Sequence, residues 1–336
     1  MNPLPKLAAL LLLLICFNLF SCAQGWNKEV SSEKDIQLLI DVVRNNLEKQ
    51  YFNKEAGKKL SMQLLKMKEQ HAFDGITAEH AAERITAMLR KVTRDKHFNV
   101  IAYHKTASAQ NASQAETPFT GGITQVKMLD QQVGYIRWDA CMAGDEAFKK
   151  LRQAIDTVAE CKHLIIDISE NPGGDGASSA FLNQFLYRSK NYQTLLIKKC
   201  TGESNWHQSE VIFNYNEGPA LFDIPLYIIV SDKTFSAAEY FAFTAQEMKR
   251  ATILGKTTAG AGNPGQATGV SLEESDIAFW MFIPNCQITT KSGRSIEGIG
   301  VAPDVELSSR DWLRETIAYI HKNEKSPSAV IPTKKP

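Results

Sequence analysis

Two short runs of branched apolar residues, each followed by a polar turn and a helical pattern, constrain the fold of this chain most strongly. The runs extend from Leu164 to Ile168 and from Leu226 to Val230. Their length and composition are typical of buried strands. Helical patterns follow them at Ala177 to Tyr187 and at Ala237 to Lys249. This alternation predicts an α/β core in which helices are layered on a sheet.

The same alternation continues on both sides of these two units. We expect further strands at 132–138, 194–199, 252–254, 277–283 and 287–290, a helix at 145–159, and a last amphipathic helix with Trp312, Leu313, Ile317 and Ile320. Because 43% of the residues are hydrophobic, the chain can bury a core of this size.

Near the beginning of the chain, the apolar residues recur with a different period. From Ser32 to Val92 the apolar residues recur at helical spacing, which predicts three short helices. The pattern changes at Asp95-Lys96-His97, and alternation from Phe98 to Tyr103 then predicts a strand. A small helical subdomain therefore precedes the α/β core.

Composition sets the remaining boundaries. Lys6 precedes an apolar run that ends in small residues, as in a secretory signal, and the stretch after Lys105 is polar. We expect a signal peptide at 1–23, an N-terminal helical subdomain at 26–104, a polar linker at 105–119, an α/β core at 120–322 and a disordered tail at 323–336.

The signal predicts an exported protein that is periplasmic, bound to the cell envelope or secreted. Cleavage after the small residues would release it, whereas acylation of Cys22 in the lipobox-like Leu19-Phe20-Ser21-Cys22 would tether it to a membrane. Both fates stay open. The formal net charge is +1 and no basic block occurs, which argues against a nucleic-acid partner.

Four cysteines lie outside the signal: Cys141, Cys161, Cys200 and Cys286. They are widely spaced and form no C-x-x-C pair, so a metal cluster is not expected. An oxidising compartment would allow one or two disulfides, but scattered buried thiols are the expected state in a domain this large.

Glycines in the turn after the first apolar run are the first candidates for chemistry. Gly173 and Gly174 lie between a strand and a helix, where backbone N–H groups can point into a cleft and stabilise an oxyanion. The alternative is a tight connection that needs a positive φ.

Ser236 occupies the corresponding turn after the second run. Its hydroxyl would act as a nucleophile facing the cleft, or it would only cap the following helix.

His97 is the candidate general base, and His104 is the rival candidate. Alternatively, His97 is only a packed residue at a hinge. Glu297, before a glycine-rich turn, would orient the base unless it is simply solvated.

Taken in order, these stretches resemble the C-terminal processing, or tail-specific, serine peptidases. The branch that they resemble includes interphotoreceptor retinoid-binding protein and the tricorn protease core. The resemblance covers roughly Asp35 to Leu307 and rests on Asp95 to Phe98, Gly134 to Ile136, Ile165 to Asp167, Asn171 to Gly174, Thr234 to Glu239, Gly255 to Gly260, and Glu297 to Asp304.

The resemblance implies an α/β fold, namely a crotonase/ClpP-like core behind a small N-terminal three-helix subdomain. A serine peptidase of this kind would need no metal or organic cofactor. The resemblance also implies roles for individual site residues. These roles are Ser236 as nucleophile, His97 as base, Glu297 linked to the base, and the amides of Ala237 and of Gly173 or Gly174 as oxyanion donors.

The sequence departs from the family pattern at two positions. In the branch with a Ser-Lys dyad the lysine would stand at Ala261, although Lys256 lies nearby. In the tricorn-like branch a serine beside the histidine links it to the glutamate, and here this neighbour is Lys96. Many members also carry a PDZ domain, for which the polar linker is too short.

We therefore expect an exported serine endopeptidase that hydrolyses a peptide or an unfolded protein through an acyl-enzyme. A non-catalytic ligand- or peptide-binding protein on the same fold is the alternative. An acyl-CoA enzyme of the crotonase type would share the oxyanion geometry, but CoA thioesters are cytoplasmic. The oligomeric state stays open.

Overall fold

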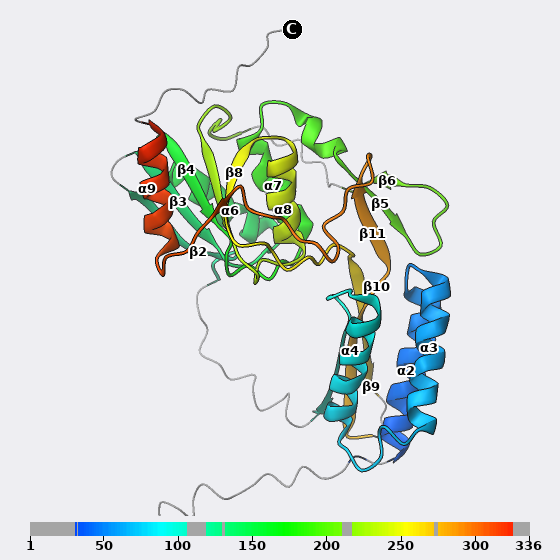
Figure 1. Ribbon diagram of the computed structural model, residues 1–336. Coiled ribbons are helices and arrows are strands. Elements are labelled where there is room, and N and C mark those ends of the chain that lie inside the picture. Colours follow the sequence, from blue (N-terminus) through cyan, green and yellow to red (C-terminus); the bar gives the residue numbers. More distant parts are fainter. Residues whose placement is uncertain are drawn as a thin grey trace, which may run out of the picture.

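The chain forms two lobes, an α/β core and a smaller lobe that contains three helices (Figure 1). The computed structural model describes residues 31, 33–105, 119–129, 132–209, 217–271 and 275–324. No helix among them is long and apolar enough to cross a membrane. The predicted signal peptide with Cys22, most of the linker and most of the tail lie outside the described residues.

A six-stranded sheet in the order β12-β8-β7-β4-β3-β2 forms the centre of the core. The strands from β12 to β3 run parallel, and β2 at the edge is antiparallel. The strands are β2 (Ile123–Leu129), β3 (Val133–Trp138), β4 (His163–Asp167), β7 (Leu226–Val230), β8 (Ala251–Gly255) and β12 (Val305–Glu306).

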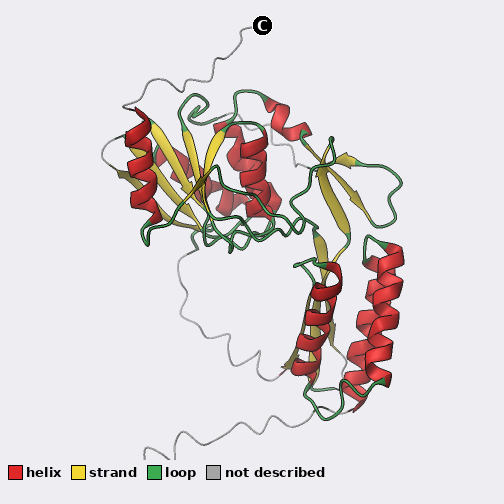
Figure 2. Cartoon of the chain, viewed as in Figure 1, coloured by secondary structure: helices red, strands yellow, loops and turns green. Residues whose placement is uncertain are grey.

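Helices cover both faces of this sheet (Figure 2). Three helices lie on one face: α6 (Asp145–Thr157), α7 (Gly176–Leu186) and α8 (Ala237–Glu247). On the other face lies α9 (Trp312–Glu324). The predicted α/β architecture is confirmed.

The two apolar runs form the central strands β4 and β7, and all of their residues are buried. Ile166 and Ile228 pack with the three-helix face, whereas Ile165 and Ile229 pack with α9. Both faces are covered, which explains the nearly continuous apolar sequence. Because β4 and β7 are parallel neighbours, the turns at their carboxyl ends lie side by side.

The smaller lobe combines the N-terminal helices with a hairpin from late in the chain. The three predicted helices are present as α2 (Glu33–Gln50), α3 (Lys54–Glu69) and α4 (Ala78–Thr93). They pack on a sheet of order β1-β10-β9, formed by β1 (Asn99–His104), β9 (Gly265–Ser271) and β10 (Ile277–Pro284). The lobe therefore joins two distant segments, and the domain boundaries stay a prediction.

A third sheet, of order β11-β5-β6, contains a disulfide. Its strands are β5 (Leu196–Cys200), β6 (His207–Gln208) and β11 (Cys286–Thr290). Cys200 and Cys286 face each other in register and are bonded, while Cys141 and Cys161 are buried free thiols. The expectation of scattered thiols is wrong for the bonded pair, because the strand register that brings them together is not visible in their spacing.

We expect replacement of both Cys200 and Cys286 by alanine to lower the free energy of unfolding by about 3 kcal/mol. The bond joins positions 86 residues apart, and without it the unfolded chain gains conformational entropy. Urea unfolding measures the difference. Cys161→Ala, which removes a buried free thiol, is the matched control, and an equal loss in both variants would contradict the prediction.

Several elements differ from the prediction in detail. β2 and β9 were not predicted, because both are edge strands with exposed residues and neither carries a continuous apolar run. A short 3₁₀ helix, η1 (Lys190–Thr194), precedes β5. Helix α9 extends to Glu324, so the first two residues of the predicted disordered tail are helical.

Candidate active site

Ser236 lies in the turn between β7 and α8. It is the N-cap residue of α8, and its φ of 54° is in the left-handed region, which residues with a β carbon rarely adopt. Such strain costs about 1–3 kcal/mol and is common at functional turns. The hydroxyl of Thr234 donates to the Ile168 carbonyl at 2.9 Å, and the Phe235 N–H donates to the Asn171 carbonyl at 3.0 Å. These bonds tie this turn to the turn after β4.

Glu239, in the first turn of α8, holds Ser236 in place. Its buried carboxylate accepts the N–H of Ser236 at 2.9 Å. It also accepts the hydroxyl of Thr258 at 2.5 Å and the N–H groups of Gly260 at 2.6 Å and Ala261 at 2.8 Å. Burial raises the pKa of Glu239, and these hydrogen bonds oppose the rise. The carboxylate therefore fixes the 258–261 loop against the serine turn.

His97 lies at the junction of the two lobes. Helix α4 ends at Thr93, and its C-cap residue Arg94, with a φ of 63°, reverses the chain just before His97. The His97 residue is only 8% exposed, and its ring lies between Phe235 of the core and Phe282 of β10, at centroid distances of 4.8 Å and 5.6 Å. Residues of both lobes therefore fix the ring.

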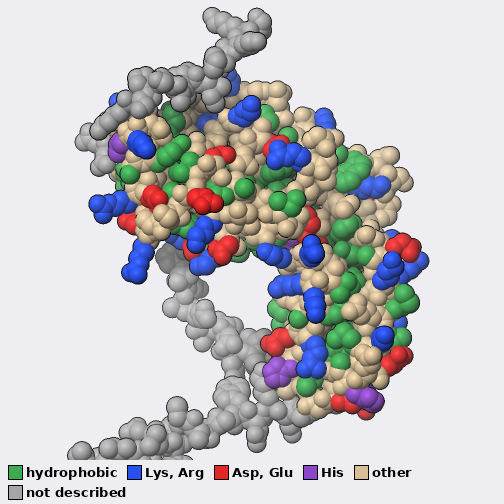
Figure 3. Space-filling model, viewed as in Figure 1, with side chains coloured by type: hydrophobic (Ala, Val, Ile, Leu, Met, Phe, Trp, Pro, Cys, Tyr) green, Lys and Arg blue, Asp and Glu red, His purple; other side chains and the backbone are tan. Residues whose placement is uncertain are grey.

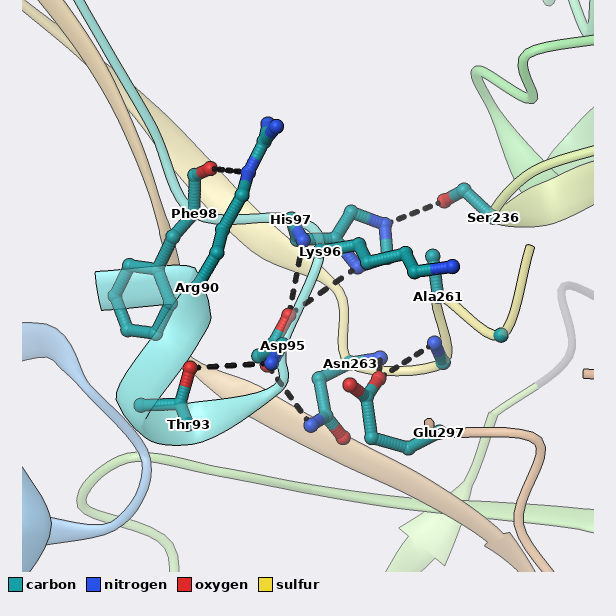
Figure 4. A network of polar contacts seen from close by, with 12 residues as sticks. Arg90, Thr93, Asp95, Lys96, His97, Phe98, Ser236, Ala261, Asn263 and Glu297 are labelled. Atoms are coloured by element: carbon teal, nitrogen blue, oxygen red, sulfur yellow. Dashed lines mark hydrogen bonds and ion pairs between the residues drawn. The ribbon is translucent and has the colours of Figure 1, made fainter. Parts of the chain in front are cut away.

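The two lobes bring Ser236 and His97 together (Figure 4). Nε2 of His97 lies 2.9 Å from Oγ of Ser236, which is hydrogen-bond distance. His104, the rival base, is half-exposed and pairs with Glu79 at 3.6 Å instead. The arrangement is that of a hydroxyl nucleophile beside a general base.

Burial keeps His97 neutral at pH 7. It lowers the pKa of His97 to about 4, and the positive charge of Arg90 adds to the effect. A neutral imidazole with its proton on Nδ1 has a free lone pair on Nε2. In that tautomer His97 can accept the proton of Ser236.

The turn after β4 brings backbone donors to Ser236. A β carbon on Gly173, whose φ is 89°, would lie 2.8 Å from that of Ser236, so the close approach requires glycine. The Gly173 N–H already donates to Asn171 Oδ1 at 2.8 Å. For the N–H groups of Gly174 and Ala237, the described residues provide no acceptor. Of the predicted oxyanion donors, these two are free to bind a ligand.

A pocket of about 260 Å³ opens beside these groups. Gly174, Ser236 and Ala237 line it, and Leu196 and Ile288 of the β11-β5-β6 sheet contribute apolar walls. The pocket can hold a substrate side chain next to the nucleophile.

Glu297 contacts a backbone loop rather than His97. Its Oε2 accepts the N–H groups of Gly262 at 2.7 Å and Asn263 at 2.9 Å. Its Oε1 is buried, and no hydrogen-bond partner for it lies within the described part of the chain. Burial, and next the negative charge of Asp95, raises the pKa of Glu297 to about 7. The predicted link between Glu297 and the base stays a prediction.

Asp95 was not a candidate from the sequence, yet it lies closer to the base. Its Oδ1 accepts the backbone N–H of His97 at 3.0 Å and lies 3.8 Å from His97 Nδ1. Its Oδ2 accepts the side-chain amide of Asn263 at 3.0 Å. The only sequence signal was its position two residues before the histidine, which also fits a local turn.

Among the described residues, one group of side chains is compact enough to hold a metal ion. It consists of Asp95, His97 and Glu297. One ligand atom from each lies within 4.8 Å of the others. Only Nδ1 of His97 and Oε1 of Glu297 are without hydrogen bonds, and a zinc site usually has at least three protein ligands. We derive no metal chemistry from this group.

Within the described ranges, no lysine takes the place of a dyad lysine beside Ser236. The predicted position holds Ala261, which is buried. The ammonium of Lys256 lies over the Trp312 ring, 5.9 Å from its centroid, and that of Lys96 donates to the Ala259 carbonyl at 2.6 Å.

Figure 3 shows Lys and Arg side chains gathered over α4 and the turn that follows it, so the surface near His97 is basic.

The raised pKa of Glu297 predicts a pH-dependent stability. Below pH 4.5 this carboxyl is protonated in both the folded and the unfolded chain, whereas between pH 4.5 and about 7 only the folded chain keeps the proton. The free energy of unfolding of the wild type should therefore fall as the pH rises through this window, whereas that of Glu297→Gln lacks this contribution. Allowing for the partial exposure of Glu297, the difference between the two falls should be on the order of 2 kcal/mol. Urea unfolding at pH 4.5 and 8 measures this, and parallel pH profiles would contradict it.

Sequence comparisons connect this site to known proteins. Residues 132–307, slightly more than half of the chain, match peptidase family S41. A carboxy-terminal-processing protease of Bartonella bacilliformis is 27% identical over 189 residues, which cover 53% of this chain and 39% of that protein. The chain spans about two fifths of the length of the curated relatives it matches.

Solved structures share the fold. A lipoprotein from Streptococcus agalactiae superposes with a TM-score of 0.59 at 15% identity, over 88% of this chain and 99% of that one. The tricorn protease gives a TM-score of 0.56 at 11% identity, over 87% of this chain and 37% of that one. The predicted crotonase/ClpP-like core is therefore confirmed, and together with the sequence match this shows that the chain belongs to peptidase family S41.

Proposed function

We propose that this protein is a serine endopeptidase of the C-terminal processing type. The observation that carries the proposal is the 2.9 Å contact between Oγ of Ser236 and Nε2 of His97. A serine in a strained turn and a buried neutral imidazole both lower the stability of the fold. Their alignment favours nucleophilic catalysis over simple packing.

In the proposed reaction, Ser236 attacks a peptide carbonyl carbon while Nε2 of His97 takes the hydroxyl proton. The N–H groups of Gly174 and Ala237 stabilise the resulting oxyanion. His97 then gives its proton to the leaving amine as the C–N bond breaks. Water, deprotonated by His97, hydrolyses the acyl-enzyme and releases a new carboxyl terminus.

The substrate is proposed to be a peptide or an unfolded protein, as the carboxy-terminal processing relatives suggest by their names. The apolar walls of the 260 Å³ pocket favour an apolar side chain next to the cleaved bond. Gly173 is proposed to shape the oxyanion loop, because its own N–H is engaged by Asn171.

The cellular location is also a proposal. The signal-like segment favours export, and acylation of Cys22 would add a membrane tether. The similar fold of a protein described as a lipoprotein in Streptococcus agalactiae is compatible with such a tether.

The domain organisation is a further part of the proposal. The helical subdomain carries His97, and the α/β core carries Ser236.

Digestion of a denatured protein tests the function. The wild type should release fragments with new carboxyl termini that mass spectrometry identifies, and Ser236→Ala should leave the substrate intact. A folded wild type that cleaves nothing, but binds an apolar ligand at one molecule per chain, would instead support a non-catalytic binding protein.

A further inference from the structure

The two ring nitrogens of His97 have different surroundings. Nε2 faces Ser236, whereas Nδ1 is buried and no hydrogen-bond partner for it lies within the described residues. Nδ1 must carry a proton if Nε2 is to accept one. Proton transfer from Ser236 makes the ring a cation, so an acceptor with negative charge at Nδ1 would favour this step.

Two carboxylates lie near this nitrogen. Oδ1 of Asp95 is 3.8 Å from Nδ1, and the Asp95 residue is 1% exposed. Glu297 contributes an atom to the same 4.8 Å cluster, but no ion pair within 4.0 Å joins it to the His97 ring in the described part of the chain. Asp95 is therefore the nearer anion.

Asp95 and His97 belong to one rigid turn. Oδ1 of Asp95 accepts the backbone N–H of His97, and the N–H of Asp95 donates to Thr93 Oγ1 at 3.1 Å. The Thr93 hydroxyl in turn donates to the Leu89 carbonyl of α4 at 2.7 Å. These local bonds keep the Asp95 carboxylate beside the His97 imidazole within one turn.

Glu297 reaches His97 only through other residues. It binds the backbone N–H of Asn263, and the side-chain amide of Asn263 donates to Oδ2 of Asp95. Figure 4 shows this series of contacts from Glu297 through Asn263 and Asp95 to His97. The loop of the core thus orients Asp95, and Asp95 faces the ring.

We propose that Asp95, rather than Glu297, is the residue that positions His97, and that Asn263 and Glu297 hold Asp95. This inference rests on the proposed peptidase function. The present 3.8 Å separation is too long for a hydrogen bond, and a shift of about 1 Å would close it. Such contacts are often long without substrate and shorten in the reacting complex.

The surroundings of Asp95 have opposing effects on its ionisation. Burial raises the pKa of Asp95, and the Asn263 amide, the His97 N–H and the charge of Arg90 oppose this rise. In the part of the chain that the structure describes, the titratable and charged groups that interact with Asp95 are His97 of its own turn and, from elements packed against it, Tyr51, Arg90, Tyr240 and Glu297.

The test compares Asp95→Asn with its matched control Glu297→Gln, since each replaces a carboxyl group by an amide at nearly constant volume. Asp95→Asn should lower kcat by about 10³-fold with little change in KM, because the imidazolium loses its counter-charge. Glu297→Gln should lower kcat by less than about tenfold. Asp95→Glu, which restores a carboxylate, should recover at least part of the lost kcat.

A second readout separates positioning from folding. In wild type and Glu297→Gln, the negative charge of Asp95 should shift the NMR signal of the His97 Nδ1–H downfield, and further when a transition-state analogue shortens the contact. Asp95→Asn should lose this shift. The acid limb of kcat/KM should also move to lower pH in Asp95→Asn, because the imidazolium is no longer stabilised. Thermal unfolding shows whether each variant is folded.

The outcomes distinguish the two proposals. A wild type without peptidase activity would count against the proposed function, while its Nδ1–H signal would still report contact with Asp95. An active wild type in which Glu297→Gln loses more activity than Asp95→Asn, with the Nδ1–H signal unchanged by Asp95→Asn, would overturn the inference.

Discussion

Replacement of Ser236 by alanine is expected to lower kcat for peptide hydrolysis by about 10⁵-fold. The variant lacks the oxygen that forms the acyl-enzyme, so only the Gly174 and Ala237 donors and substrate binding remain. Alanine keeps the β carbon and the strained φ of this position, so the fold should persist. Steady-state kinetics with a fluorogenic peptide measure kcat, and circular dichroism checks the fold.

Ser209→Ala is the matched control for Ser236→Ala. Ser209 also lines the 260 Å³ pocket, but it follows β6 and is not in the turn before α8. Its backbone N–H donates to the Leu196 carbonyl. We expect its kcat to stay within about threefold of the wild type. A Ser236→Ala protein that keeps a tenth of the wild-type kcat would exclude Ser236 as the nucleophile.

Replacement of Glu239 by alanine is expected to lower the free energy of unfolding by about 4 kcal/mol. Its carboxylate satisfies the N–H groups of Ser236, Gly260 and Ala261 and the hydroxyl of Thr258 inside the core. The substitution leaves these donors buried without acceptors and frees the loop beside the nucleophile. Activity should therefore fall along with stability.

Urea unfolding measures this loss, with Glu315→Ala as the control. The Glu315 carboxylate also accepts backbone N–H groups, those of Ser308 and Ser309, but it lies at the surface of α9 and is only partly buried. Water can replace it there, so the urea midpoint of this variant should hardly change. Equal midpoints for Glu239→Ala and the wild type would show that the 258–261 loop does not depend on this carboxylate.

The sheet was predictable because its signal is local. The runs at 164–168 and 226–230 are buried on both faces, and a strand buried in this way has few polar residues whatever its neighbours are. β9 was not predictable by the same rule. Its Gly-Gln-Ala-Thr-Gly-Val-Ser sequence forms an edge strand only because β10 provides a partner for it.

The site was predictable in part. The contact between Ser236 and His97 followed from the order of the motifs, not from their spacing, since 139 positions separate the two residues. Asp95 and Glu239 were passed over because their local patterns have common structural explanations, a turn before a strand and an acidic first turn of a helix. What distinguishes them is their long-range contacts with Asn263 and with the 258–261 loop.

A covalent probe tests the central claim most directly. A fluorophosphonate should add once to the wild type, peptide mapping should place the adduct on Ser236, and His97→Ala should slow the addition by several orders of magnitude. A folded wild type that gains no adduct, or one that reacts as fast without the His97 imidazole as with it, would contradict the account.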